Sequence, residues 1–291
     1  MARVVVIGSG PAGVSAALYA RRGGAEVTVV SRGEQTGALA KAHLIENYYG
    51  LEEPVSGAEL LRRGIAGARK LGVEFTEDEV LSLAFDDSFT GFLVEGRKAK
   101  LAADSVILAA GAARSSLKLP GIAGFEGKGV SYCAVCDAFF YRGKTVAVIG
   151  AGEYALHEAQ ALLPHAARVV LLTNGAEPAV AVPADIEVQT GALAAIEGET
   201  RVARVRFADG SALDTDGVFL ALGTAGSTEL ARKLGIMLAG NNIKTDAHMA
   251  TNVPGIFAAG DCTGGLLQVA KAVYEGAEAG LAAVKFLREK Q

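Results

Sequence analysis

The stretch Val4-Val5-Val6-Ile7-Gly8-Ser9-Gly10-Pro11-Ala12-Gly13 decides the fold class. A short β-branched run passes directly into three glycines. An Ala-rich stretch through Ala20 and a second β-branched run, Val27–Val30, then follow. Because β-branched residues favour strands and alanine favours helices, the segment predicts a strand, a helix and a second, parallel strand.

A second copy of this pattern begins 142 residues further along the chain. Thr145–Ile149 is the expected strand, followed by the turn Gly150-Ala151-Gly152-Glu153-Tyr154-Ala155 and a helix through Leu163. Val169–Leu172 supplies the second strand. So long a spacing is typical of two nucleotide-binding domains and excludes a solenoid of short repeats.

Residues 101–111 and 213–223 also resemble each other, because each is an apolar strand ending in Gly. If each closes its own βαβ half, the second domain interrupts the first, and Pro120-Gly121 marks the first crossing. We therefore expect two Rossmann-like, three-layer α/β domains, the second inserted into the first. The first covers 1–116 and 245–291, with a final helix from about Gln268 to Lys290, and the inserted domain covers 117–244.

Composition excludes several classes of protein. The 291 residues carry 28 Lys and Arg against 32 Asp and Glu, a net charge of −4, which argues against nucleic-acid binding through bulk charge. Hydrophobic residues make up 51% of the chain, so a packed core is expected. The N-terminus runs straight into a strand, and no run of about 18 uncharged apolar residues occurs, so we expect a cytoplasmic protein without membrane contact.

The glycine pattern Gly8-x-Gly10-x-x-Gly13 is credible as a dinucleotide site because it follows a strand and opens a helix. Glycines let the backbone approach a pyrophosphate, whose charge lies at the helix N-terminus. The next strand ends in Ser31-Arg32 and not in an acid, so the usual ribose contact is missing. The pattern alone does not separate a flavin from a nicotinamide.

The motif Cys133-Ala134-Val135-Cys136-Asp137 stands just before the second βαβ unit. A zinc site is disfavoured, because no second CxxC and no nearby His completes four ligands, so no metal is expected. Two inert thiols are the plainer alternative. A redox-active dithiol is favoured, since CxxC spacing permits a reversible disulfide and the adjoining Asp137 can supply a proton.

Four motifs, in this order, resemble the low-molecular-weight thioredoxin reductases over essentially the whole chain: Gly8–Gly13, Ile45–Gly50, Tyr132–Asp137 and Ala258–Asp261. The resemblance implies a homodimer in which an FAD-binding domain is interrupted by a smaller domain that carries the CxxC. Cys133 would attack the thioredoxin disulfide, Cys136 would face the flavin, and Asp137 would be the acid. The FAD ligands that it implies are Gly8, Gly10, Pro11, Ala12, Gly13, Gly37, Leu39, Asn47, Val80, Gly111, Gly260, Asp261, Gln268 and Val269.

Departures from the family pattern concern the electron donor. NADPH-using members carry His-Arg-Arg after the second strand of the inserted domain, where this chain has Thr173-Asn174-Gly175. Residues 169–200 contain no Lys or Arg to meet a 2′-phosphate, and Thr173 is not the acid that NADH prefers. Tyr154 puts a bulky ring into the phosphate turn, and residues 175–185 are too short and proline-broken for the usual helix.

The C-terminal segment, Gly260–Gly265 followed by Gln268, Lys271 and Glu275, resembles the ferredoxin-linked flavin thioredoxin reductases. Ferredoxins near roughly −400 mV can reduce thioredoxin near about −270 mV, and a flavin can collect two single electrons. The expected activity is thioredoxin reduction with ferredoxin as donor. Alternatives are an NAD(P)H-dependent thioredoxin reductase, a dithiol oxidase acting on a small molecule and, from a different class, a non-catalytic flavin redox sensor.

Several conspicuous residues are expected to have plain structural roles. Cys262 fits a small buried residue better than a third redox thiol. The four histidines lack ligand spacing. The basic run from Arg62 to Lys70 is expected to be a solvated helix face and not a docking site for ferredoxin.

Overall fold

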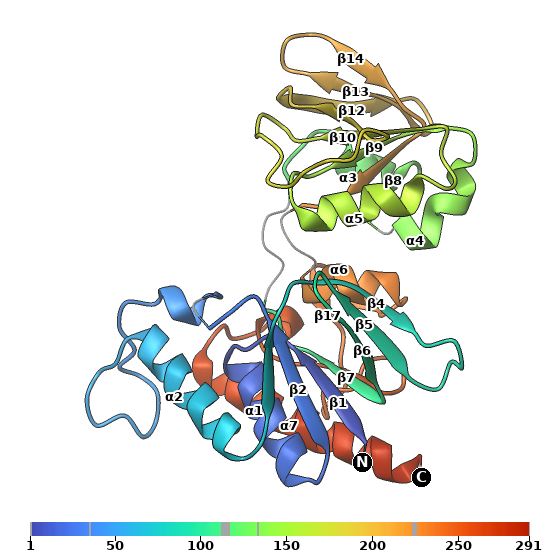
Figure 1. The fold of residues 1–291 in the computed structure, drawn as a ribbon. Coiled ribbons are helices and arrows are strands. Elements are labelled where there is room, and N and C mark those ends of the chain that lie inside the picture. The colour runs from blue at the N-terminus through green and yellow to red at the C-terminus, as the bar shows by residue number, and fades with distance from the viewer. Residues whose placement is uncertain (1, 35, 112–116, 133, 223–225, 291) are drawn as a thin grey trace. The chain divides into compact units, whose positions relative to one another are not determined.

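The computed structural model describes residues 2–34, 36–111, 117–132, 134–222 and 226–290, with only the backbone of Val135 and Cys136. The chain forms two compact units (Figure 1). Unit 1 comprises Met1–Ala113 and Gly226–Gln291, and unit 2 comprises Arg114–Ala225. Unit 2 is therefore inserted into unit 1, as the paired βαβ patterns predict.

The predicted second boundary is wrong. The chain returns to unit 1 at Gly226, and not at residue 245. Helix α6 (Ser227–Lys233) belongs to the core of unit 1, because Ser227 Oγ accepts a 2.9 Å hydrogen bond from Ala110 N and Lys233 Nζ donates to Leu81 O at 3.1 Å. The first boundary differs from the predicted one by three residues, which lie outside the described part.

Unit 1 is built on a parallel sheet of five strands in the order β18-β7-β1-β2-β3. The predicted first βαβ unit is confirmed, with its helix ending two residues later than expected. Besides α6, the strands of this sheet and the helices of unit 1 are β1 (Arg3–Ile7), α1 (Pro11–Arg22), β2 (Glu26–Ser31), η1 (Leu39–Lys41), α2 (Gly57–Lys70), β3 (Glu74–Glu77), β7 (Ser105–Leu108), β18 (Ile256–Ala258), η3 (Asp261–Thr263) and α7 (Val269–Glu289).

Two antiparallel sheets complete unit 1. They are β4 (Val80–Phe85), β5 (Phe92–Gly96) and β6 (Lys100–Ala103), and the pair β16 (Leu238–Ala239) and β17 (Asn242–Ile243).

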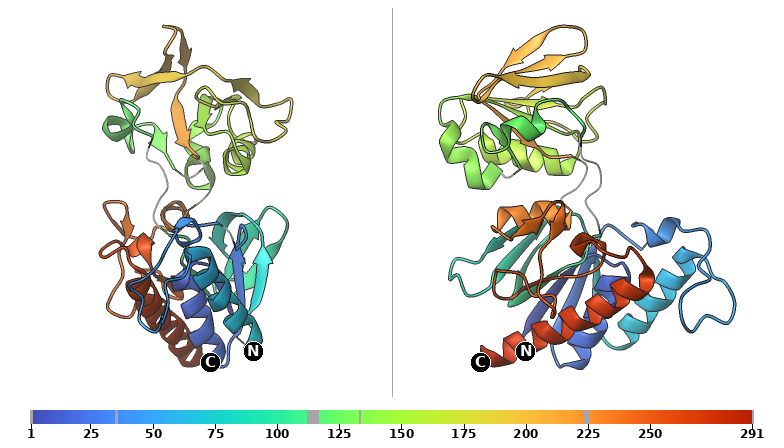
Figure 2. Two further views of the ribbon diagram at one scale, coloured as in Figure 1. Left: turned by 90° about the vertical axis from the view of Figure 1, so that its left-hand side faces the viewer. Right: turned by 180° about the vertical axis from the view of Figure 1, so that it is seen from behind.

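Helices α1 and α7 pack side by side at very short range (Figure 2). A Cβ atom on Gly276 would lie 2.1 Å from Ala12 O, and one on Gly280 would lie 2.4 Å from Ala16 O. Glycine at both positions is therefore a steric requirement of this contact. Through it, the start of α1 and the first half of α7 are held together.

Unit 2 repeats the architecture with a parallel sheet in the order β11-β10-β9-β15-β8 and an antiparallel sheet β12-β13-β14. The second predicted βαβ unit is confirmed to within one residue at each boundary. The elements are α3 (Ile122–Phe125), β8 (Val130–Ser131), α4 (Ala134–Asp137), η2 (Ala138–Tyr141), β9 (Thr145–Ile149), α5 (Glu153–Leu162), β10 (Arg168–Leu172), β11 (Glu187–Gln189), β12 (Leu193–Gly198), β13 (Val202–Phe207), β14 (Ala212–Asp214) and β15 (Gly217–Leu220).

Residues 175–185 contain no helix, as predicted from their two prolines. Within the described residues, no helix combines the length and apolar character that crossing a membrane requires.

Candidate active site

The predicted cofactor residues gather at one edge of the sheet in unit 1. Strands β1, β7 and β18 are parallel neighbours, so their carboxyl ends meet at the same edge. Gly8 follows β1, Gly111 lies three residues beyond β7, and Gly260 with Asp261 follows β18. The structure thus brings together residues that are up to 253 positions apart in the sequence.

The three glycines of the first motif have different roles. Gly8 has a φ of +114°, and a Cβ there would meet Ala109 O at 2.3 Å. A Cβ on Gly13 would meet Gly8 O at 1.8 Å, so this glycine lets the helix approach the turn. Gly10 has no heavy atom within 4 Å of its would-be Cβ. Gly10 therefore leaves open the space that a pyrophosphate needs.

The N-terminus of α1 is suited to an anion. Gly10 caps the helix without a side-chain hydrogen bond, Pro11 stands at its start, and the first turn carries no acidic side chain. The first backbone N–H groups and the positive end of the helix dipole are thus available to a phosphate. The residues present fit a dinucleotide.

Two predicted cofactor residues on distant segments contact each other. Asn47 Nδ2 donates a hydrogen bond to Gln268 Oε1 at 3.3 Å, across 221 sequence positions. Gln268 caps α7 and Val269 is its first residue. The loop containing Asn47 is thereby joined to the start of α7.

The remaining predicted cofactor residues also belong to unit 1. Gly37 and Gly111 have φ values of +110° and +79°, with open space beside each. Leu39 begins η1 and is half-buried. Val80 is a buried residue at the start of β4 in the antiparallel sheet, two residues after Asp78, whose N–H donates to Ser31 O at the carboxyl end of β2.

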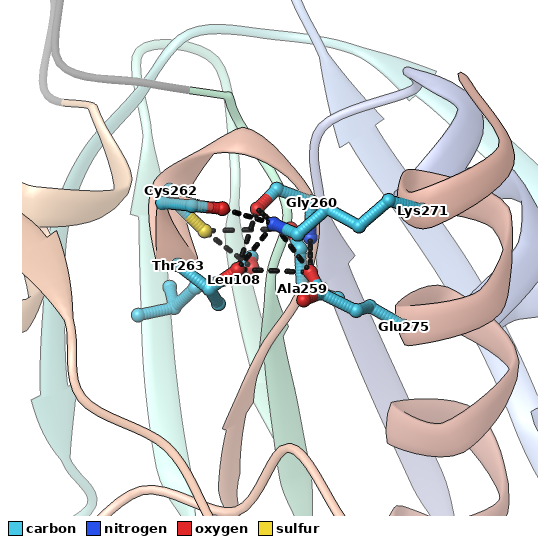
Figure 3. A network of polar contacts seen from close by, with 8 residues as sticks. Leu108, Ala259, Gly260, Cys262, Thr263, Lys271 and Glu275 are labelled. Atoms are coloured by element: carbon cyan, nitrogen blue, oxygen red, sulfur yellow. Dashed lines mark hydrogen bonds and ion pairs between the residues drawn. The ribbon is translucent and has the colours of Figure 1, made fainter. Parts of the chain in front are cut away.

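A buried ion pair holds the turn after β18 (Figure 3). Lys271 Nζ lies 3.0 Å from Glu275 Oε2 and donates to Gly260 O at 2.9 Å and to Thr263 Oγ1 at 2.8 Å. Glu275 Oε2 in turn accepts from Gly260 N at 2.8 Å. The ion pair was not predicted from the sequence, although the i, i+4 spacing of Lys271 and Glu275 on the expected helix is a signal for it.

The CxxC motif lies partly outside the described residues: Cys133 entirely, and Cys136 by its side chain. Its described neighbours are well anchored within unit 2. Asp137 Oδ2 accepts a hydrogen bond from Ser131 Oγ at 2.7 Å, and Glu158 Oε2 accepts one from Ala134 N at 2.7 Å. Burial and the negative charge of Asp137 raise the pKa of Tyr141. Sequence reasoning missed Ser131 and Glu158.

The ring of Tyr154 does not block the second glycine turn in the way predicted. Tyr154 is fully buried, with 0% of its surface exposed, so its ring packs inside unit 2. A ring covering the open face of the turn would be reached by solvent. The expectation that Tyr154 stands in the path of a phosphate is therefore not supported.

The described residues 169–200, which include the end of β10, contain no Lys or Arg for a nucleotide phosphate. The Thr173 hydroxyl donates to Ala176 O, and Asn174 Oδ1 accepts from Leu193 N at 2.8 Å, so both side chains are used in turning the chain. Arg168 stands at the opposite, amino end of β10 and is paired with Glu187 at 2.7 Å.

The surroundings of Cys262 and of the arginines on α2 agree with the structural roles predicted for them. Cys262 is fully buried, its thiol donates to Leu108 O and Ala259 O, and burial raises its pKa to about 12. Arg62 and Arg63 are both paired with Glu59 on the exposed face of α2.

Comparison with known proteins shows which family the chain belongs to. Residues 2–276 match the model of the pyridine nucleotide-disulphide oxidoreductases. The thioredoxin reductase of Aquifex aeolicus is 34% identical, over 99% of this chain and 94% of that protein. The crystal structure of the atypical thioredoxin reductase TRi from Desulfovibrio vulgaris Hildenborough has a TM-score of 0.92 at 38% identity, covering 100% and 99% of the two chains.

A ferredoxin-flavin thioredoxin reductase from Clostridium acetobutylicum is also similar, with a TM-score of 0.76 at 32% identity over 99% of each chain. The sheet edge, its open glycine turn and these similarities agree. The chain belongs to the pyridine nucleotide-disulphide oxidoreductase family and, within it, to the FAD-binding thioredoxin reductases.

Proposed function

We propose that this enzyme reduces thioredoxin with electrons from reduced ferredoxin, through FAD and a Cys133–Cys136 dithiol. The observation that carries the donor assignment is the end of β10, where Thr173 and Asn174 are engaged in the turn and the described residues 169–200 include no Lys or Arg for a 2′-phosphate. Unit 1 is then the FAD-binding domain. Unit 2 keeps the shape of an NAD(P)H domain and serves to carry the dithiol.

The FAD would be held at the carboxyl edge of the unit 1 sheet. Gly8, Gly10 and Gly13 leave room for the pyrophosphate at the start of α1, and Asn47, Asp261 and Gln268 supply polar groups for the rest of the molecule. When bound, FAD provides a carrier that takes up electrons singly and passes them on as a pair.

The dithiol carries out the exchange with thioredoxin. The Cys133 thiolate attacks one sulfur of the thioredoxin disulfide, which forms a mixed disulfide and releases a thioredoxin thiolate. Asp137 donates the proton that this thiolate takes up. Cys136 then attacks the Cys133 sulfur, so that thioredoxin leaves as a dithiol and a Cys133–Cys136 disulfide remains, to be reduced again by two electrons and two protons.

A ferredoxin donor is supported by three further points. A ferredoxin-flavin thioredoxin reductase is among the similar solved structures. Ferredoxins near about −400 mV are reducing enough for thioredoxin near about −270 mV. A one-electron protein donor needs no pocket for a nicotinamide.

Two enzyme alternatives and one non-enzymatic alternative make different predictions. An NAD(P)H-dependent thioredoxin reductase would agree with the Aquifex aeolicus relative, whose name gives no ferredoxin donor, but it would need a cation that the described residues 169–200 lack. A dithiol oxidase would consume small dithiols without thioredoxin. A flavin redox sensor would show no turnover with any donor.

The deciding experiment adds NADPH, NADH or reduced ferredoxin anaerobically to the yellow holoenzyme and follows the flavin absorbance. We expect reduced ferredoxin to bleach the flavin and to support thioredoxin reduction. Two lost charged phosphate contacts, at about 1.5–3 kcal/mol each, weaken NADPH by roughly 100-fold or more, so millimolar NADPH should leave the flavin oxidised over minutes. Rapid bleaching by micromolar NADPH would return the enzyme to the NADPH-dependent branch.

The protein is further proposed to be a cytoplasmic homodimer. Tyr274 and Leu281, 58% and 50% exposed, are seven residues apart on one side of α7 and offer apolar surface to a second copy. Three cysteines in 291 residues suit a reducing compartment.

A further inference from the structure

Helix α5, which follows the second glycine turn, carries a carboxylate directed at the CxxC segment. Glu158 is 1% exposed, and its Oε2 accepts a 2.7 Å hydrogen bond from Ala134 N. That amide belongs to the peptide bond between Cys133 and Ala134. Burying a carboxylate is unfavourable unless hydrogen bonds satisfy it, so this contact helps to stabilise Glu158 in its buried position.

The other end of the same short helix is anchored in a similar way. Ser131 on β8 donates to Asp137 Oδ2 at 2.7 Å. Helix α4 has only four residues, Ala134–Asp137, and a helix of one turn has little stability of its own. Its placement therefore relies on contacts with the neighbouring elements α5 and β8.

We propose that Glu158 is a positioning residue for the redox dithiol: its buried carboxylate holds the Cys133–Ala134 peptide and thereby orients the attacking cysteine. The inference rests on the proposed role of Cys133 and Cys136. Thiol–disulfide exchange requires the attacking sulfur to be aligned with the bond that it breaks, so a displaced peptide slows the reaction. Helix α5, which follows the second glycine turn, would thus position the dithiol.

The carboxylate also has an electrostatic effect. The hydrogen bond to Ala134 N puts this negative charge beside the CxxC segment, and a negative charge disfavours a neighbouring thiolate. His157 Nδ1 lies 3.4 Å from Glu158 Oε1, and Asp137 is the acidic residue of α4; neither is altered by the Glu158 substitutions. Glu158→Gln removes the charge, yet its amide oxygen can still accept the Ala134 N–H and its amide nitrogen can face His157. Glu158→Leu removes both functions.

The test uses pre-reduced, desalted holoenzyme in a single turnover with oxidised thioredoxin, so it is independent of the electron donor. We expect Glu158→Gln to transfer electrons within about threefold of the wild-type rate. Glu158→Leu should be slower by about tenfold or more, because a buried N–H loses its acceptor. The exposed neighbour Gln160, changed to Ala, is the matched control and should behave like the wild type.

A second measurement depends on the charge of Glu158, and a merely structural role of this residue would not change its result. The rate at which iodoacetamide alkylates the reduced dithiol at pH 7 should rise by about threefold or more in both Glu158 variants, since both lose the charge. FAD content and circular dichroism should be unchanged. If Glu158→Leu does not fold, the alkylation rate of Glu158→Gln still decides.

Wild-type transfer by Glu158→Leu, or wild-type alkylation in Glu158→Gln, would overturn the positioning role. Failure of the proposed function has a different signature. In that case Cys133→Ser would reduce thioredoxin as the wild type does, or the wild type would not reduce it at all.

Discussion

Lys271 Nζ lies 3.0 Å from Glu275 Oε2, one turn further along α7, with side-chain exposures of only 15% and 11%. The pair joins the start of α7 to the turn after β18, because both residues also bond to Gly260. Gly260 has a φ of +86° and precedes Asp261, a proposed FAD ligand. The ion pair therefore fixes backbone in the cofactor site without having to contact the cofactor.

Breaking this pair should weaken both the fold and FAD binding. Lys271→Ala leaves Glu275 partly buried without its cation, which we expect to cost about 2–4 kcal/mol in the free energy of unfolding. Urea unfolding and FAD titration of the apoprotein measure the two effects. Lys285→Ala is the control, because Lys285 is 78% exposed on the same helix, and it should change stability by less than about 0.5 kcal/mol.

The cost of breaking this pair comes largely from the buried charge that is left without a partner. The double variant Lys271→Met/Glu275→Leu leaves no unpaired charge, so its cost should be smaller than the sum of the single-variant costs. Additive costs would show that the two side chains act independently.

Gly10→Ala should separate folding from cofactor binding. A Cβ at this position meets no protein atom within 4 Å, so the apoprotein should fold and melt as the wild type does. In the holoenzyme the same methyl group would enter the space assigned to the pyrophosphate. We expect FAD recovered per chain to fall from near one to well below one half.

Gly67→Ala is the matched control for that experiment. Gly67 on α2 also has open space at its Cβ but lies outside the proposed site. It should keep its FAD and gain about 0.5–1 kcal/mol from higher helix propensity. A Gly10→Ala enzyme with a full complement of FAD would place the pyrophosphate elsewhere.

Replacing Cys133 or Cys136 should impair the enzyme in different ways. Cys136→Ser should abolish thioredoxin reduction while an artificial donor still reduces the flavin. Cys133→Ser should leave a Cys136 thiolate beside the flavin, visible as a long-wavelength charge-transfer band. Absorbance spectra and thioredoxin turnover of both variants measure this. Full turnover in both would refute the proposed electron path.

The sequence predicts local structure better than it predicts long-range contacts. The strands before Gly8 and Gly150 end where expected, because β-branched runs and glycine turns are encoded within a few residues. Helix α6 escaped prediction because it has seven residues, and its place in unit 1 depends on Lys233 reaching Leu81, 152 positions away.

In the site, too, local patterns were predictable from the sequence and long-range contacts were not. The glycine turn and the CxxC motif are contiguous patterns, and both could be recognised without coordinates. Glu158 is 24 positions from Ala134 and lies on another element, so no local pattern predicts their hydrogen bond. The ring of Tyr154 was misplaced for a related reason, since spacing alone does not say which face of α5 is buried.

The stability that Cys262 contributes should depend on pH. Burial raises the pKa of this thiol to about 12, whereas in the unfolded chain it ionises near about 8.5. Above that lower pKa the unfolded chain has lost a proton that the folded chain retains, so unfolding is favoured as the pH rises. The stability contributed by the neutral thiol is therefore complete below about pH 8 and falls by up to about 1.4 kcal/mol per pH unit towards pH 12.

Cys262→Ala lacks this titration. Its free energy of unfolding should lie below the wild-type value at pH 7.5, because the bonds to Leu108 O and Ala259 O are lost. The difference should shrink, or change sign, by pH 10. Urea unfolding of both holoenzymes at the two pH values measures it. A difference that stays constant between pH 7.5 and 10 would mean that the folded and unfolded thiols ionise alike, and that solvent reaches Cys262 in the folded enzyme.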